Sequence, residues 1–313
     1  MITENNKNTF WTRIPVILSA AFFATFLWGS AFPCIKVGYS LMNISSNDSA
    51  SQMLFAGIRF FLAGAMVLLF GSIQQHKPLL LGKGSIKNVL ILMLTQTVGQ
   101  YFFFYIGLAH ASGVASSIIE ASATFFTILA AVFIFHFEKL TPMKVLGCVL
   151  GFAGVLIVQI PGQQMGTLSL TGEGFVLIST LMASAAANFI KIFSKNESAV
   201  ALSGWQFTGG GLIMAVFGLL SGGKLTFSNP AALLLIVYMA FISAAAYTLW
   251  GLLLSHNDVS RIAVFGFFNP LVGVLLSAVL LNEQNEAFSV YGMLALILVC
   301  LGIIIVFRKT KTN

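Results

Sequence analysis

The chain has 313 residues, of which 58% are hydrophobic and only 8% are charged, with a formal net charge of +7. Soluble domains carry about 25% charged residues, so this composition excludes a single soluble globular domain. The basic residues flank apolar runs and form no separate basic domain, which argues against nucleic acid as a partner.

Ten apolar segments are long enough to cross a membrane. The hydrocarbon core of a bilayer is about 30 Å thick and takes about 20 helical residues to cross. The apolar runs are continuous and do not alternate with polar residues, which predicts helices and not barrel strands. In chain order we expect spans at 16–40, 53–73, 89–109, 113–135, 143–160, 174–193, 201–220, 231–255, 259–281 and 290–307.

The distribution of positive charge predicts the orientation of these spans. With the N-terminus inside, thirteen of the sixteen Lys and Arg residues fall at the inner ends of the spans. Cytoplasmic flanks of membrane helices carry such an excess. We therefore expect a multi-pass protein with both termini in the cytoplasm.

The two halves of the chain share landmarks. Glu138 closes the fourth span and Glu283 closes the ninth, and each is followed nine residues later by a glycine. Counting fourteen residues back from each glutamate pairs Thr124 with Asn269. The sequence from Gly57 to Phe60 likewise matches Gly204-Trp-Gln-Phe in the second and seventh spans.

This match predicts an internal repeat of five helices. Because five is odd, the second copy must lie upside down relative to the first, which is the plan of many secondary transporters. We expect an all-α integral membrane protein with ten transmembrane helices in two inverted five-helix repeats, residues 1–160 and 161–313.

The same residues carry a family resemblance. Trp28-Gly-Ser-Ala-Phe in the first span, Arg59 in the second and the two Glu-plus-Gly endings resemble an EamA-type permease of the drug/metabolite transporter superfamily. The resemblance implies a cavity walled mainly by spans 1, 3, 4, 6, 8 and 9, and export of amino acids or related small metabolites. It further implies a place in the bacterial inner (plasma) membrane.

Other functions remain as alternatives. Within transport, the runner-up is an uptake permease or exchanger for another metabolite, such as a sugar phosphate or nucleotide derivative. The chain has no His-Glu-x-x-His, Walker A or Gly-x-Ser-x-Gly motif, so we expect no enzyme activity, no metal and no cofactor. An intramembrane enzyme or a receptor-like sensor is the alternative from another class. The expected partners are a small-molecule substrate, the lipid bilayer and protons as the coupling ion, with no obligate protein partner.

Two charges inside predicted spans are candidate functional groups. A charge at the centre of a span costs about 2.5–3.5 kcal/mol on insertion scales, so it is normally paired or kept for function. Arg59 and Glu120 lie at similar depth, about 9–11 Å from the outer ends of their helices at 1.5 Å per residue. One hypothesis is a site where Arg59 holds a substrate carboxylate and Glu120 an amine or a proton. The other is a buried ion pair that fixes helix packing.

Polar and aromatic residues complete the predicted site. Trp28, Tyr101, Tyr247 and Trp250 lie in wall helices and would suit a partly apolar solute or an ammonium group. Asn188 continues a polar stripe along the sixth span, although Ser and Thr in such stripes often bond only to their own helix. The predicted substrate-binding or coupling residues are Glu120, Arg59, Trp28, Gln100, Tyr101, Asn188, Tyr247, Trp250 and Asn269. The alternative for each aromatic residue is helix packing.

Overall fold

The structure is a computed structural model that describes residues 10–45, 47–82, 84–110, 119–159, 169–272, 276 and 290–307. Regular structure in these residues is helical, and none of them forms a β-strand. The all-α prediction is thus confirmed for this part of the chain. Its elements are α2 (Ile14–Leu41), α3 (Ser49–Gln75), α4 (Ile86–Leu92), η1 (Met93–Gly99), α5 (Gln100–His110), α7 (Ala123–Leu129), η2 (Ala130–Ile134), α8 (Pro142–Gln159), η3 (Leu170–Gly174), α9 (Phe175–Phe193), α10 (Ala199–Leu220), α11 (Pro230–His256), α12 (Val259–Ala263), η4 (Val264–Phe267) and α15 (Val290–Phe307).

Six helical stretches in the described residues are long and apolar enough to cross a membrane. They are Ile14–Leu41, Ser49–Gln75, Ile86–Leu108, Leu170–Phe193, Ala199–Leu220 and Pro230–His256. Their ends lie within four residues of six predicted spans. Four shorter apolar helices, Ile119–Ile134, Pro142–Ile157, Val259–Val272 and Leu296–Phe307, overlap the other four predictions. Ser116, in the fourth predicted span, and Glu283, just after the ninth, are outside the described residues.

Side-chain caps set where two of the long helices begin. The Asp48 side chain accepts a hydrogen bond from the backbone N–H of Ser51 at the start of α3. The Asn229 side chain accepts one from Ala231 at the start of α11, where Pro230 occupies the first turn. Such caps satisfy backbone N–H groups that have no partner within the helix. They explain why both helices begin before their predicted apolar runs.

Helices α3 and α10 pack antiparallel through glycines. A β-carbon on Gly57 would lie 2.2 Å from the backbone nitrogen of Ala215, and one on Gly64 would lie 2.7 Å from the carbonyl oxygen of Gly204. A β-carbon on Gly211 would lie 2.8 Å from the carbonyl oxygen of Gly57. Only residues without a side chain allow backbones in a membrane to approach this closely. The spacing Gly-x6-Gly, which occurs twice in α3 (Gly57, Gly64, Gly71) and twice in α10 (Gly204, Gly211, Gly218), is therefore the sequence basis of this contact.

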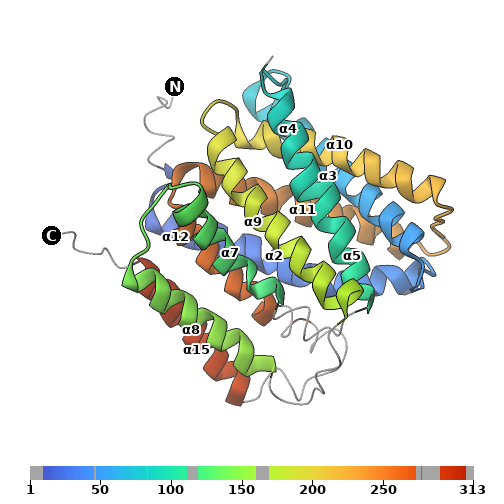
Figure 1. The fold of residues 1–313 in the computed structure, drawn as a ribbon. Coiled ribbons are helices and arrows are strands. Elements are labelled where there is room, and N and C mark those ends of the chain that lie inside the picture. Colours follow the sequence, from blue (N-terminus) through green and yellow to red (C-terminus); the bar gives the residue numbers. More distant parts are fainter. Residues whose placement is uncertain are drawn as a thin grey trace.

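The other helices pair across the two halves of the chain. Helix α2 packs on α11, α5 on α9, α7 on α9 and α12, and α8 on α15. Figure 1 shows α8 and α15 side by side at one edge of the bundle. There Gly147 faces Gly302, and a β-carbon on either would lie within 2.7 Å of the other's carbonyl oxygen. The Gly147-x-x-x-Gly151 motif thus serves packing within the chain.

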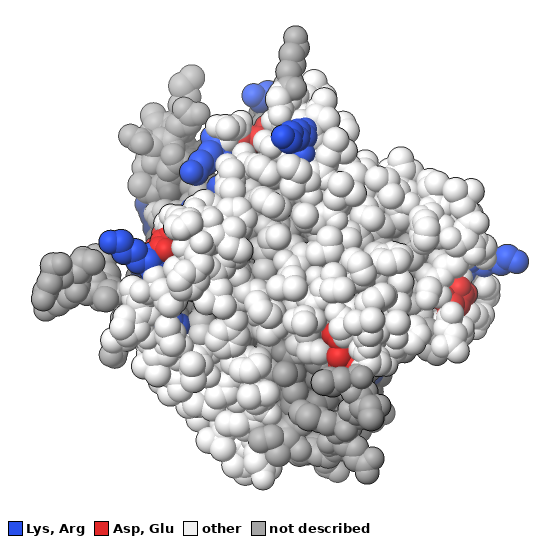
Figure 2. Space-filling model, in the orientation of Figure 1, with Lys and Arg blue, Asp and Glu red and all other residues white. Residues whose placement is uncertain are grey.

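The outer surface is apolar, as expected for a protein in lipid. Large hydrophobic side chains such as Leu69, Phe70, Phe133, Leu219 and Leu234 are at least 60% exposed. Figure 2 shows a face that is almost free of charge, with Lys and Arg side chains near its edges. An apolar surface this extensive marks contact with a membrane, because monomeric soluble proteins rarely expose such patches.

Candidate functional site: a central cavity

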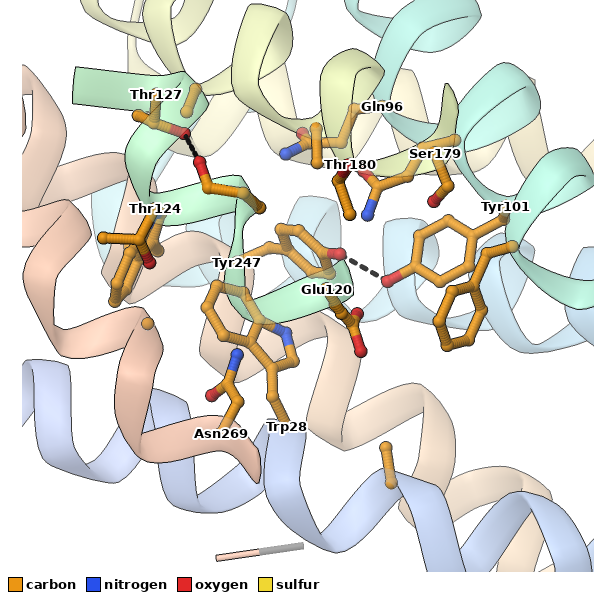
Figure 3. Close-up of a pocket in the computed structure, with 18 of the residues that line it drawn as sticks. Trp28, Gln96, Tyr101, Glu120, Thr124, Thr127, Ser179, Thr180, Tyr247 and Asn269 are labelled. Atoms are coloured by element: carbon orange, nitrogen blue, oxygen red, sulfur yellow. Dashed lines mark hydrogen bonds between the residues drawn. The ribbon is translucent and has the colours of Figure 1, made fainter. Parts of the chain in front are cut away.

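A cavity with a volume of about 150 Å³ lies at the centre of the bundle. Its wall takes side chains from α2, α3, η1, α5 and α7 in the first half and from α9, α11, α12, η4 and the turn after η4 in the second. Figure 3 shows Trp28, Glu120, Tyr101, Tyr247 and Asn269 around this space. Both halves of the chain therefore contribute to one site.

Eight of the nine predicted site residues line this cavity: Glu120, Arg59, Trp28, Gln100, Tyr101, Tyr247, Trp250 and Asn269. Asn188 does not. Its side chain is fully buried, and its amide nitrogen donates to the carbonyl oxygens of Thr127 at 3.2 Å and Ser184 at 2.9 Å. The polar stripe of α9 turns at this level from the cavity toward α7, so Asn188 joins these two helices.

Glu120 presents a carboxylate to the cavity. It lies in the helical turn before α7 and is half-buried. Among the residues that the structure describes, none forms a hydrogen bond or ion pair with this carboxylate. Its neighbours in Figure 3 are the aromatic side chains of Trp28, Tyr101 and Tyr247. An acidic group in such surroundings is available to a solute or a proton.

Arg59 is held by other helices. Its Nε atom donates to the carbonyl oxygen of Met239 at 3.2 Å and to Ser243 Oγ at 3.0 Å, and an Nη atom donates to the Tyr105 hydroxyl at 3.3 Å. The guanidinium also lies over the Phe60 ring, 5.0 Å from its centroid. The Arg59 side chain is 2% exposed, so little of it is accessible from the cavity that it lines.

The buried ion pair between Arg59 and Glu120, one of the two hypotheses from the sequence, is not formed. Both side chains are described, and the ion pair found in the described part of the chain joins Lys144 to Glu138. Equal depth places two residues at one level of the membrane, whereas the rotation of each helix sets the direction of its side chains. Arg59 points toward α11 and α5, and Glu120 points into the cavity.

Aromatic rings form a continuous part of the wall. The Trp28 ring makes edge contacts with Tyr247 and Trp250, at centroid distances of 4.9 and 5.0 Å. The hydroxyls of Tyr101 and Tyr247 are hydrogen-bonded to each other, as the dashed line in Figure 3 shows. These contacts show that each ring both packs against its neighbours and faces the cavity, so the two hypotheses for the aromatic residues are not exclusive.

Three buried polar atoms of the cavity residues have no hydrogen-bond partner within the described part of the chain. They are Trp28 Nε1, Gln100 Oε1 and Asn269 Oδ1. Burying a polar atom without a hydrogen-bond partner destabilises a protein by about 1–3 kcal/mol, so such atoms are uncommon and call for an explanation. A solute would reach these atoms only after the wall rearranges, because they have almost no accessible surface in this structure.

Sequence reasoning missed the small residues of the wall. Ser179, Ala183 and Ala187 of α9 line the cavity at intervals of four residues. Their small side chains leave the space that the larger aromatic residues enclose. This i, i+4, i+8 pattern of small residues on one helix face was the available signal. Gln96 also lines the cavity, and its side-chain oxygen accepts a hydrogen bond from Gln206 of α10.

A π-helical stretch lies beside the site. The seven residues of η1, between α4 and α5, have wider turns than an α-helix. Gln96 lies within η1 and Gln100 directly follows it. Stretches of π-helix are frequent at functional sites, and here the wider turn rotates the amide-bearing residues relative to α4.

Comparison with known proteins identifies the family. The model of the EamA-like transporter family matches residues 15–160 and again residues 170–308. The chain belongs to the EamA-like transporter family. The family and its relatives are transporters, so the chain is a membrane transporter.

Several known proteins are similar to this chain over most of their length. A probable amino-acid metabolite efflux pump of Escherichia coli (strain K12) is 28% identical over 287 residues, which cover 85% of this chain and 87% of that protein. The uncharacterized transporter YvbV of Bacillus subtilis (strain 168) is 23% identical over 313 residues, covering 96% and 94%. A crystal structure with 16% sequence identity matches with a TM-score of 0.74 over 94% of this chain and 97% of that chain, which shows a shared fold.

Proposed function

We propose that this chain is a secondary transporter that exports amino acids or related small metabolites across the bacterial inner membrane by alternating access. The observation that carries the proposal is the central cavity lined by both halves of the chain. Binding sites between two structural repeats are typical of secondary transporters, since each repeat can rock against the other. The chain has no nucleotide-binding motif, so the energy comes from a gradient or from exchange.

The proposed architecture is ten transmembrane helices in two inverted repeats, residues 1–160 and 161–313. The helix pairs support it. In the proposed repeat, α2 corresponds to α9, α3 to α10, α5 to α11 and α8 to α15. Replacing α2 and α11 by their counterparts gives α9 and α5, which are also in contact. The same exchange leaves the α3–α10 and α8–α15 pairs unchanged. Such a pattern is expected of a two-fold axis in the membrane plane.

Contacts between loops support the proposed grouping of the segments on two sides of the membrane, and the distribution of Lys and Arg assigns the side with the termini to the cytoplasm. On the proposed inner side, the amide nitrogen of the Asn257 side chain donates to the Trp11 carbonyl oxygen at 3.0 Å, and Gly82 N donates to the Glu197 carboxylate at 3.0 Å. On the proposed outer side, the backbone N–H of Lys224 donates to Ser51 Oγ at 2.8 Å. Each bond joins two segments that the proposed topology places on the same side of the membrane.

Two considerations support an amino acid or a related metabolite as the cargo. The Escherichia coli and Salmonella typhimurium relatives are named as probable amino-acid metabolite efflux pumps. Arg59 and Glu120 are the two charged residues among those lining the cavity, and Arg59 is already bonded to three protein groups. A sugar phosphate or a nucleotide derivative carries more negative charge than this wall can neutralise. Protons are the proposed coupling ion, and Glu120 is the proposed carrier.

Solute flux through purified protein tests the proposal. Protein reconstituted in liposomes loaded with unlabelled amino acids should accumulate the same radiolabelled amino acids by exchange. A panel that covers apolar, aromatic and charged amino acids identifies the cargo, and protein-free liposomes are the control. If no member of the panel exchanges faster through protein-containing than through protein-free liposomes, amino acids are not the cargo.

A further inference from the structure

We propose that the cavity recognises its substrate through a protonated amine, and that the amine binds at Glu120 because Arg59, the cation among the described wall residues, is held by the protein. This inference rests on the proposed function, because it names the recognised chemical group within the same cavity. An exporter of amino acids could accept both organic ammonium ions and organic acids. The inference predicts that the ammonium ions bind more tightly.

The first step is that Arg59 is engaged by the protein. Its guanidinium is bonded to Met239, Ser243 and Tyr105, and it is 2% exposed. Tyr105 itself is 1% exposed, so it cannot swing aside without disturbing the core. A carboxylate commonly binds Arg through two parallel N–H donors in one plane. These bonds use Nε and one Nη group, and at 2% exposure the rest of the guanidinium leaves a solute carboxylate little room for that geometry.

The second step is that Glu120 is not engaged by the described residues. Its side chain is only half-buried, it lines the cavity, and it has no hydrogen bond or ion pair to a residue that the structure describes. An ionised carboxylate in an apolar wall lacks the hydration that it had in water, so a cation that pairs with it is bound favourably. Glu120 is therefore the charged group that a solute meets.

The third step is the balance of the remaining polar atoms. The unpartnered oxygens Gln100 Oε1 and Asn269 Oδ1 are acceptors, and Trp28 Nε1 is the unpartnered donor of the cavity wall. A primary ammonium has three N–H donors and no acceptor, so acceptors are what it needs. The Trp28, Tyr247 and Trp250 rings line the same cavity. An aromatic ring attracts a cation that lies over its face within about 6 Å of the centroid. The unpartnered acceptors thus outnumber the unpartnered donor, which favours an ammonium over a carboxylate once a solute reaches them.

A matched series of three ligands tests the inference. Phenethylammonium carries an amine, 3-phenylpropionate carries a carboxylate, and L-phenylalanine carries both, all on similar phenyl-bearing chains. Calorimetric titration of the purified protein in detergent would give each dissociation constant. We expect phenethylammonium and L-phenylalanine to bind at least about tenfold more tightly than 3-phenylpropionate, a difference of about 1.4 kcal/mol.

Two variants assign the effect to Glu120. Glu120→Gln keeps the size of the side chain and should weaken phenethylammonium binding at least about tenfold, as expected for loss of a charge-assisted bond. Glu173→Gln is the matched control, because the Glu173 carboxylate accepts a hydrogen bond from Ser169 N outside the cavity. It should leave binding unchanged. If Glu120→Gln does not fold, the ligand series on the unmodified chain decides alone.

Equal or tighter binding of 3-phenylpropionate, no binding of phenethylammonium, or unchanged affinity in a folded Glu120→Gln variant would each overturn the inference. These results are distinct from failure of the proposed function. A protein that exchanges amino acids in liposomes but does not bind phenethylammonium overturns the inference alone. A protein that binds phenethylammonium at Glu120 but moves no amino acid overturns the proposed cargo and leaves the inference standing.

Discussion

The hydroxyls of Tyr101 and Tyr247 are hydrogen-bonded to each other at the centre of the molecule and join α5 to α11. Both side chains are 7% exposed and both line the cavity. Beside them, Phe60 and Phe207 lie 5.4 Å apart between ring centroids, and each also contacts one of the two tyrosines. The two tyrosines therefore couple the two halves of the chain at the wall of the proposed site.

Removing either hydroxyl should destabilise the protein. Tyr101→Phe and Tyr247→Phe each leave the other hydroxyl without this partner, which costs about 1–3 kcal/mol for a buried group. The double variant should lose less than the sum of the single losses, because both changes remove the same bond. Unfolding titrations of purified protein measure the three losses. Tyr291→Phe is the control, since Tyr291 is 46% exposed on α15; strictly additive losses would contradict the coupling.

The Arg59 and Glu120 variants should act independently. Arg59→Gln leaves the groups of α5 and α11 that bond to Arg59 without a partner. We expect the free energy of unfolding to fall by about 1–3 kcal/mol for each buried group affected. Because Arg59 bonds to Tyr105 and Ser243 and not to Glu120, adding Glu120→Gln should not restore the loss. Unfolding titrations of the two single variants and the double variant would show losses that add within about 0.5 kcal/mol. A double variant that is clearly more stable than Arg59→Gln would instead establish an ion pair.

Acid should release the loop contact at Glu197. Partial burial of this carboxyl raises its pKa, but hydrogen bonds from the Ser85 side chain and from the Gly82 and Ser198 backbone outweigh the burial, so its pKa is lowered. A lowered pKa stabilises the folded protein above the unfolded-state value of about 4.3, and that contribution is lost as the pH falls through the folded-state pKa.

The difference in thermal midpoint between the unmodified protein and Glu197→Gln measures this contribution. We expect the unmodified protein to be more stable at neutral pH and the difference to shrink below a pH of about 4, near the unperturbed pKa of a glutamate. A difference that does not change with pH would show that the charge of Glu197 does not contribute to the contact with Gly82.

Labelling of single cysteines should establish the orientation of the chain. In a background without the three natural cysteines, Asn47→Cys and Lys224→Cys should react with an impermeant reagent in intact cells. Gln75→Cys and Lys195→Cys should react only after the membrane is opened, because they lie at ends that the distribution of Lys and Arg assigns to the cytoplasm. All four positions are exposed in the structure. Reaction of Lys195→Cys in intact cells would contradict the proposed topology.

The sequence predicted the helices well because continuous apolar length is a strong signal. It also located most of the cavity, since charged, amide and aromatic side chains are costly in lipid and gather where both halves meet. The match of Gly57 with Gly204 indicated equivalent helices, and the structure shows their glycines at one interface. These features depend on spacing along one helix, which a single sequence displays directly.

The sequence could not predict which side chains meet across helices. Arg59 and Glu120 share a depth, yet the rotation of α3 turns Arg59 toward Ser243 and Tyr105. Asn188 lies on a polar stripe, yet it bonds to Thr127 of the neighbouring helix. The π-helical stretch η1 also has no clear sequence signal. Its wider turns change the direction in which the side chains after it point. Helix rotation and neighbour identity are set by packing of the whole bundle.

Filling the cavity tests the central claim most directly. Ala183 and Leu181 lie on the same helix, but Ala183 lines the cavity and Leu181 is 45% exposed on the apolar surface. In exchange assays with equal amounts of reconstituted protein, Ala183→Trp should nearly abolish solute flux because the indole occupies the space of the solute. Leu181→Trp should transport like the unmodified chain. Undiminished flux through correctly folded Ala183→Trp would show that the solute does not pass through this cavity.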